Sequence, residues 1–211
     1  MSAARSMHTD GITHLFFDVG GVLGTAGWGT PDRADAAKHF GYDPKDAERR
    51  HDGVVTAWET GRMTIDEYLD HTVFAQPRPF TREAFTAYMR SRSVPNEESL
   101  ALARALAGTG RYRMFTLNNE SEALNLHRIS YFGLGDMFDA FLSSCWLGVS
   151  KPARRTYQLA LAFTQATPAC SVFIDDREEN LEPARDAGMH TIRFTSAADL
   201  RAALGALGIN F

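Results

Sequence analysis

Five short apolar runs along the chain have the length and composition of buried β-strands, and polar or glycine-containing segments bound them. Segments with a helical pattern lie between successive members of the last four runs. The runs cover residues 13–19, 112–117, 140–143, 171–174 and 190–194. Strands that alternate with helices form parallel sheets whose right-handed crossovers cover both faces. The pattern therefore predicts a doubly wound α/β fold, with a Rossmann-like parallel sheet of about five strands.

The long stretch between the first two runs differs, because all of it has the pattern of helices, and four or five helices fit there. The helix expected to open at Pro95 and Asn96 ends near Gly108 and leads into the second strand, so it belongs to the core. We therefore expect an inserted all-helical cap at residues 27–93, a core at 11–26 and 94–211, and a flexible tail at 1–10. The other helix-start signals are Thr30 with Pro31, Asp43 with Pro44, Thr64 with Glu67, and Thr81, and the expected C-terminal caps are Gly41 and Gly61.

The composition excludes several classes of protein. With 44% hydrophobic and 23% charged residues, the chain resembles soluble globular proteins. Lys and Arg number 22 against 26 Asp and Glu, so the basic excess that nucleic-acid binding uses is missing. No apolar run is long enough to cross a membrane or to serve as a signal segment. Cys145 and Cys170 fit no metal spacing and are too few for a disulfide scaffold, which favours a cytoplasmic location.

Polar side chains follow three of the predicted strands at the point where each strand ends. Asp18 follows the first run, Asn118 and Asn119 follow the second, and Asp175 and Asp176 follow the fourth. Ligands of open parallel sheets bind at the carboxyl ends of the strands, so these groups are expected to converge. Adjacent carboxylates repel each other and are commonly retained to bind a cation. Together with Asp18 they predict a site of hard oxygen ligands suited to Mg²⁺.

Lys151 lies before the helix that follows the third strand, with Pro152 expected near the first position of that helix. A lone lysine there is usually a surface residue. Clustered carboxylates, however, need a cation to offset their repulsion. Gly20 and Gly21 follow Asp18 closely and permit a tight turn near a ligand. The three carboxylates together with Lys151 therefore indicate a binding site more specifically than any one of these residues does.

Four segments in this order, FFDVGGVL, TLNNES, GVSKP with Tyr157, and VFIDDREENLEPARDAGM, resemble the motifs of the haloacid dehalogenase superfamily. The resemblance covers essentially the whole chain. The helical insertion and the last segment are similar to the phosphatase domain of soluble epoxide hydrolase and to bacterial sugar-phosphate phosphatases.

The resemblance implies a set of residue roles. Asp18 corresponds to the nucleophile and to a metal ligand, Lys151 to the motif lysine, and Gly20 to a residue that offers its backbone carbonyl to the metal. Asn118 takes the position that binds the phosphoryl group, with Asn119 beside it as a second substrate-binding residue. Asp175 and Asp176 correspond to the acidic metal motif, and Asn180 either matches an asparagine of this branch or caps a helix.

Two positions depart from the family pattern. Related phosphatases usually carry an acidic proton donor where this chain has Gly20. Without it, rates should depend steeply on leaving-group pKa, unless a side chain of the cap or the substrate supplies the proton. Asn118 replaces a hydroxyl residue but can still donate to an oxyanion. Thr116, two residues earlier on the same strand face, is the alternative.

The reaction implied is hydrolysis of a small phosphomonoester, with a sugar phosphate as one candidate, through an aspartyl-phosphate at Asp18. One alternative is a 2-haloacid dehalogenase, which Gly20 favours and the pair of Asp175 and Asp176 opposes. Another is a binding or regulatory protein that kept the fold and lost turnover. Neither the substrate nor the oligomeric state can be inferred from the sequence. Candidates to line the substrate pocket are His51, Trp58, Arg62, Tyr68 and His71, with Trp28 and Thr30 nearer the first motif.

Overall fold

The computed structural model describes residues 11–211 and contains one sheet of five parallel strands in the order β3-β2-β1-β4-β5. The strands are β1 (His14–Phe17), β2 (Arg113–Thr116), β3 (Ala140–Phe141), β4 (Ser171–Asp175) and β5 (His190–Arg193). The predicted doubly wound α/β fold is confirmed. The third strand is shorter than expected, because Ser143 turns away to hydrogen-bond Asn118. The expected tail at residues 1–10 lies outside the described residues.

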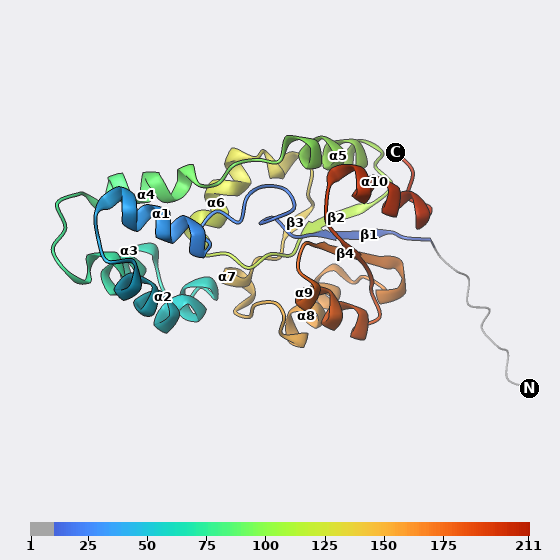
Figure 1. Ribbon diagram of the computed structural model, residues 1–211. Coiled ribbons are helices and arrows are strands. Elements are labelled where there is room, and N and C mark those ends of the chain that lie inside the picture. The colour runs from blue at the N-terminus through green and yellow to red at the C-terminus, as the bar shows by residue number, and fades with distance from the viewer. Residues whose placement is uncertain (1–10) are drawn as a thin grey trace, which may run out of the picture.

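Alternate residues of each strand face opposite layers of helices, as the period of two in a strand requires. Leu15 and Phe17 of β1 belong to the core cluster under α5 and α10, whereas Phe16 belongs to the cluster under α8 and α9. Figure 1 shows these two helix pairs on opposite faces of the sheet. Helices and turns of this part of the chain are α5 (Glu97–Gly108), α6 (Glu122–Tyr131), η2 (Leu134–Asp136), α7 (Ser144–Leu147), α8 (Arg154–Thr164), η3 (Pro168–Cys170), α9 (Glu178–Asp186) and α10 (Ala197–Ala206).

Four α-helices and a short 3-10 turn lie between β1 and α5 and form what is called here the insert. They are α1 (Thr30–Phe40), α2 (Pro44–Glu59), α3 (Ile65–His71), η1 (Val73–Ala75) and α4 (Arg82–Ser91). They pack around a separate apolar cluster that includes Trp28, Trp58, Tyr68 and Phe85. Figure 1 shows the insert at one end of the sheet, beyond the carboxyl end of β1. Among residues 11–211, no helix combines the length and apolar character needed to cross a bilayer.

Most of the expected helix ends are observed. Asp43, Thr64, Thr81 and Asn96 each accept a backbone hydrogen bond as N-caps, and Gly41 and Gly61 follow their helices with positive φ.

One expectation about a helix start was wrong. Gly29, rather than Thr30, caps α1, because the Thr30 hydroxyl instead donates to Glu48 at 3.2 Å. Pro152 precedes α8 by two residues, since Ala153 takes the cap position and the helix begins at Arg154.

One tight contact between the insert and the core, called here the insert–core joint, lies where the end of α2 meets α7. The Ser144 hydroxyl donates to the Glu59 carbonyl at 2.6 Å and accepts from the Glu120 N–H at 3.0 Å. Gly61 approaches so closely that a Cβ there would lie 2.0 Å from the Cys145 carbonyl oxygen, and its φ is +72°. Both steric space and backbone conformation therefore require glycine at position 61.

Gly61→Ala is expected to lower the free energy of unfolding by about 1–3 kcal/mol, because the added methyl group must displace α7 while the left-handed backbone is strained. Gly53→Ala is the matched control, since Gly53 lies within α2 and a Cβ there meets nothing within 4 Å. The control should stabilise the protein by roughly 0.5–1 kcal/mol. Equal effects of the two variants in urea unfolding would contradict this description of the joint.

Candidate active site

Three carboxylates meet at the carboxyl edge of the sheet. Asp18 directly follows β1, where its N–H donates to the Ile174 carbonyl of β4 at 2.9 Å. Asp175 is the last residue of β4, and Asp176 comes next. One oxygen from each carboxylate lies within 4.8 Å of the others. The parallel pairing of β1 with β4 therefore brings together the acidic groups singled out in the sequence.

The Lys151 ammonium lies between two of these carboxylates. Its Nζ is 3.0 Å from Asp18 Oδ2 and 2.6 Å from Asp175 Oδ2, and the residue is 4% exposed. Asn119 fixes the backbone of this lysine, because its amide nitrogen donates to the Lys151 carbonyl and its oxygen accepts from the Lys151 N–H, both at 2.8 Å. Asn119 thus positions Lys151 by bonds that the sequence did not reveal.

Asp175 is saturated by protein donors. Besides Lys151, its oxygens accept from the Arg177 N–H at 2.8 Å and from the Asn180 amide at 3.0 and 3.1 Å. Asn180 lies inside α9 rather than at its N-cap, and its side-chain amide hydrogen-bonds this carboxylate. Asp175 is fully buried. These donors occupy both oxygens of Asp175 and join its carboxylate to the Lys151 ammonium.

Asp176 has the opposite character. Its Oδ1 is buried and has no hydrogen-bond partner among the described residues. Gly21, with a φ of +83°, lets the chain pass close by, since a Cβ there would lie 2.5 Å from Asp176 Oδ2. An unpaired, buried carboxylate oxygen is costly unless a cation completes it. Of the two adjacent aspartates, Asp176 is therefore the one with an oxygen available to a metal.

Electrostatics of the site favour a cation. Burial raises the pKa of Asp18 to about 7, and Asp175 adds to the rise while Lys151 opposes it. Burial and the charge of Asp175 also raise the pKa of Asp176. Three carboxylates share one ammonium, so the ionised site carries excess negative charge that a divalent ion would neutralise.

The Asn118 side chain makes bonds inside the protein. Its amide donates to Asn125 at 3.1 Å and its oxygen accepts from Ser143 at 2.9 Å, and the residue is 3% exposed. The second N–H of the Asn118 amide is not used in these hydrogen bonds. Thr116 is also buried, and its hydroxyl has no partner among the described residues. The expected contact of Asn118 with substrate stays a prediction.

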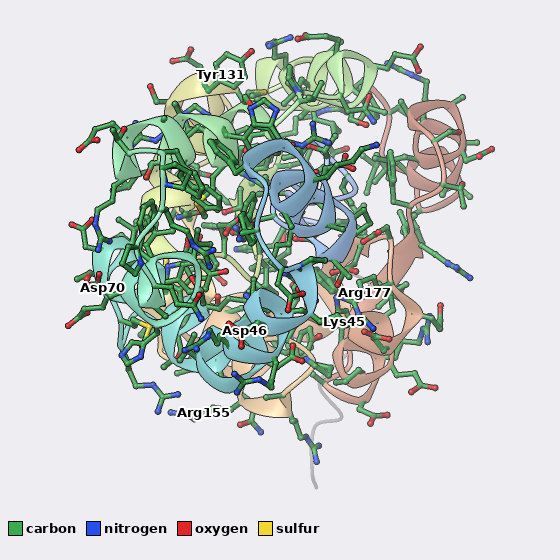
Figure 2. All side chains as sticks on the ribbon, turned by 60° about the vertical axis from the view of Figure 1, so that its left-hand side comes forward. Lys45, Asp46, Asp70, Tyr131, Arg155 and Arg177 are labelled. Carbon is green, nitrogen blue, oxygen red and sulfur yellow. The ribbon has the colours of Figure 1, made fainter. Side chains whose placement is uncertain are left out.

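A cavity of about 380 Å³ lies between the site and the insert. This volume is within the range of small-molecule sites. In Figure 2, Arg177 lies where the insert meets the C-terminal part of the core, and Asp70 points outward from the insert. The lining includes Asp18, Gly20, Asn119, Lys151, Asp176, Trp28, Thr30, His51 and Trp58, together with Arg33, Glu59, Glu120, Arg128 and Arg177.

Some of the residues expected at the substrate pocket do not line this cavity. Tyr68 lines a neighbouring apolar cavity, and its hydroxyl holds His51 at 2.9 Å. Arg62 and His71 line neither of these two cavities. Sequence reasoning missed Glu59, Glu120 and Arg128, although Glu120 lies within the second motif, directly after Asn119, and this position was a usable signal.

The comparisons with known proteins agree with the fold. A family model described as haloacid dehalogenase-like hydrolase matches residues 12–188. The chain is 30% identical over 208 residues to phosphatase MT3486 of Mycobacterium tuberculosis, covering 84% of this chain and 85% of that protein. It is 35% identical over 113 residues to bifunctional epoxide hydrolase 2 of Rattus norvegicus, covering 52% of this chain and 20% of the rat protein. The chain thus matches about a fifth of that relative's length.

The structure also resembles a solved one. The HAD family enzyme bt-2542 of Bacteroides thetaiotaomicron, in complex with magnesium and inorganic phosphate, superposes with a TM-score of 0.77 at 22% identity, over 88% of this chain and 95% of that chain. At this identity the likeness concerns the fold. From the family match, the chain belongs to the haloacid dehalogenase-like hydrolases and is an enzyme of that class.

Asp18→Asn is expected to stabilise the metal-free protein. The raised pKa of Asp18 in the folded state means that its ionisation lowers stability as the pH rises from about 4 towards 7. The variant should match the native protein near pH 4 and exceed it by at least about 1 kcal/mol above neutral pH in chelator. Asp136→Asn, which removes an exposed carboxylate, is the control. Equal pH dependence of melting in the native protein and Asp18→Asn would contradict the assignment.

Proposed function

We propose that this enzyme is a magnesium-dependent phosphatase that hydrolyses a small phosphomonoester through an aspartyl-phosphate on Asp18. The observation that carries the proposal is the position of Asp18 in the wall of the cavity, with Lys151 and a carboxylate bearing an unpaired oxygen around it. A nucleophilic carboxylate, a fixed positive charge and a cation site are the groups that phosphoryl transfer needs. The phosphatase named among the relatives supports the same reaction.

The residues present fit a magnesium ion. Asp18, Asp176 and the Gly20 carbonyl are the proposed ligands, and all three residues line the cavity. The buried Asp176 oxygen without a partner fits a hard cation that prefers oxygen ligands. Asp175 is then a supporting residue, because Lys151, Asn180 and the Arg177 N–H occupy its oxygens. A bound magnesium ion would supply Lewis-acid neutralisation of charge on the phosphoryl oxygens.

The side chains of the site divide the remaining work. Lys151 holds Asp18 in place and neutralises charge that collects on the transferring phosphoryl group. Asp175 and Asn119 hold Lys151, the first by its ammonium and the second by its backbone. Asn118 retains one N–H with which to hydrogen-bond the phosphoryl group. Water then hydrolyses the aspartyl-phosphate and restores the Asp18 carboxylate.

We further propose that residues 27–93 act as a cap over a core of residues 11–26 and 94–211. The cavity walls come from both parts, so closure of the cap would exclude water and select the substrate. The polar lining and the volume suit a small hydrophilic molecule, for which a sugar phosphate is one candidate. The two cysteines and the composition remain consistent with a cytoplasmic enzyme.

The two alternatives predict different behaviour. A 2-haloacid dehalogenase would displace halide from carbon without a metal, which leaves the unpaired Asp176 oxygen without a purpose. A protein that binds ligand without turnover would keep the cavity and lose the reaction. The unpaired oxygen therefore favours the metal-dependent phosphatase.

The decisive experiment measures phosphate release from 4-nitrophenyl phosphate with and without Mg²⁺. The native enzyme should require Mg²⁺, and Ca²⁺ should inhibit, because Ca²⁺ prefers more ligands and longer bonds than an octahedral site provides. Asp18→Asn should abolish turnover while circular dichroism stays unchanged. Full activity in excess chelator, or an active Asp18→Asn, would overturn the proposal. A screen of phosphorylated metabolites under the same conditions would then identify the substrate.

Asp175→Asn and Asp176→Asn should have different consequences. Asp176→Asn is expected to weaken Mg²⁺ binding, measured by calorimetry, with little loss of stability. Asp175→Asn should lower the free energy of unfolding by about 1–3 kcal/mol, because the Lys151 ammonium loses a buried partner. If Asp175→Asn instead weakened Mg²⁺ binding alone, the division between a structural and a metal-binding aspartate would be wrong.

A further inference from the structure

An alkoxide that leaves phosphorus needs a proton, and the residue two positions after Asp18 cannot donate one because it is Gly20. The guanidinium of Arg128 and the backbone of Ala26 lie beside Gly20. A Cβ on Gly20 would lie 3.5 Å from Arg128 Nη1 and 3.5 Å from the Ala26 Cα. Arg128 is 2% exposed, and its guanidinium also donates to the Ala26 carbonyl at 2.5 Å. The proton donor must therefore come from another part of the cavity wall.

Most titratable groups of the wall are excluded by their chemistry. Arginines keep their protons at neutral pH. Lys151 is committed to two carboxylates. Burial lowers the pKa of His51 to about 4, so this imidazole is neutral. Tyr68 lines the neighbouring apolar cavity rather than this one, and its hydroxyl is engaged with Trp28 Nε1 at 3.1 Å and His51 Nδ1 at 2.9 Å. Asp18 and Asp176 are the proposed nucleophile and metal ligand, so Glu59 and Glu120 remain.

The two glutamates are held together at the insert–core joint. Glu59 is the last residue of α2, and its carbonyl accepts from the Ser144 hydroxyl at 2.6 Å. The same hydroxyl accepts from the Glu120 N–H at 3.0 Å. A single buried hydroxyl thus joins the backbone of one glutamate from the insert to that of one from the core, and both side chains line the cavity that Asp18 also lines.

The partners of the two carboxyls differ. Burial raises the pKa of Glu120, whereas Arg128 at 3.4 Å and the Ser121 N–H, which donates to it at 3.0 Å, oppose that rise. The Glu59 carboxyl has no hydrogen bond or ion pair with the described residues. Burial, followed by the charge of Glu120, raises the pKa of Glu59 to about 7. Arg33 of α1 and Arg177 before α9 also face it and lower this value.

We propose that Glu59 is the general acid that protonates the leaving oxygen and then the general base that activates water. As the Asp18 oxygen bonds to phosphorus, the bond from phosphorus to the ester oxygen breaks and its electron pair stays on that oxygen. The Glu59 proton moves to this oxygen and an alcohol leaves. The Glu59 carboxylate next takes a proton from water as the water oxygen bonds to phosphorus. The bond from phosphorus to Asp18 breaks, which releases phosphate and restores both side chains.

This inference rests on the proposed phosphatase activity, and it predicts how rates depend on the leaving group. A poor leaving group such as an alkoxide needs the proton, whereas 4-nitrophenolate leaves without it. The first step requires the protonated form of Glu59, so kcat/KM for alkyl phosphates should fall as the pH rises through about 7. Glu59 would thereby make alkyl and sugar phosphates accessible to an enzyme that has glycine at position 20.

The test compares Glu59→Gln with the native enzyme on a series from 4-nitrophenyl phosphate to alkyl phosphates, with Mg²⁺ present. Glu59→Gln should lose about 10²- to 10⁴-fold in kcat/KM on alkyl phosphates, with a far smaller loss on 4-nitrophenyl phosphate. The fall in rate above pH 7 should disappear. Glu59→Asp should recover part of the alkyl-phosphate rate. Asp52→Asn is the matched control, since it removes an exposed carboxylate from the same helix and should leave the series unchanged.

A second variant tests whether the negative charge of Glu120 raises the pKa of Glu59. Glu120→Gln removes the repulsion on Glu59, so the fall in rate should begin at a lower pH. An equal loss on every substrate in Glu59→Gln, or an unshifted pH profile in Glu120→Gln, would overturn the assignment of Glu59 as the acid. Turnover of 4-nitrophenyl phosphate by the native enzyme would leave the proposed function standing in that case. Absence of any phosphate release from the native enzyme would instead refute the proposed function itself.

Discussion

The placement of the Lys151 ammonium between Asp18 and Asp175 is the interaction on which the rest of the site depends. Two strand ends bring these carboxylates together, and their repulsion in a buried setting would oppose folding. One ammonium touches both at hydrogen-bonding distance. Asn119 clamps the lysine backbone, while Asn180 and the Arg177 N–H complete Asp175. The protein thus neutralises part of the charge and leaves Asp176 with an oxygen for a cation.

The insert depends on a different constraint, which is close approach of two backbones. Gly61 allows the end of α2 to contact α7, and Ser144 bonds to residues on both sides of that contact. The apolar cluster of the insert also includes Leu124 of α6, so the insert packs against the core as well as around its own side chains. This arrangement brings Glu59 to the cavity wall although α2 belongs to the insert. The insert and the core therefore both contribute side chains to the cavity.

Several charged side chains of the cavity wall pair with a side chain of opposite charge. Glu120 is matched by Arg128, and Arg33 is matched by Glu48 through two hydrogen bonds at 2.7 Å. Against this background, the buried Asp176 oxygen is conspicuous because it has no hydrogen-bond partner among the described residues. Buried polar groups are almost always satisfied in folded proteins. That oxygen marks the position where a cation would complete the site, and the half-buried Glu59 carboxyl lines the cavity that a substrate would fill.

The sequence alone determined the architecture and the acidic centre. Apolar runs of strand length, separated by helices, specify a parallel sheet, and the carboxyl ends of its strands lie at one edge whatever the details of packing. For that reason the convergence of Asp18, Asp175 and Asp176 was predictable, as were the caps at Asp43 and Thr64, which depend on residues within one helical turn.

What only the tertiary structure decided depends on contacts between distant segments. The partners of Asn118 and Asn119 come from α6, from the segment after β3 and from the Lys151 backbone, so their orientation cannot be read from their own neighbourhood. The same holds for Asp176, whose free oxygen distinguishes it from Asp175 only once every donor is in place. Glu59, Glu120 and Arg128 were missed because a carboxylate or guanidinium on a helix is ordinarily a solvated surface group. Burial against another part of the chain, which no local pattern encodes, is what changes their chemistry.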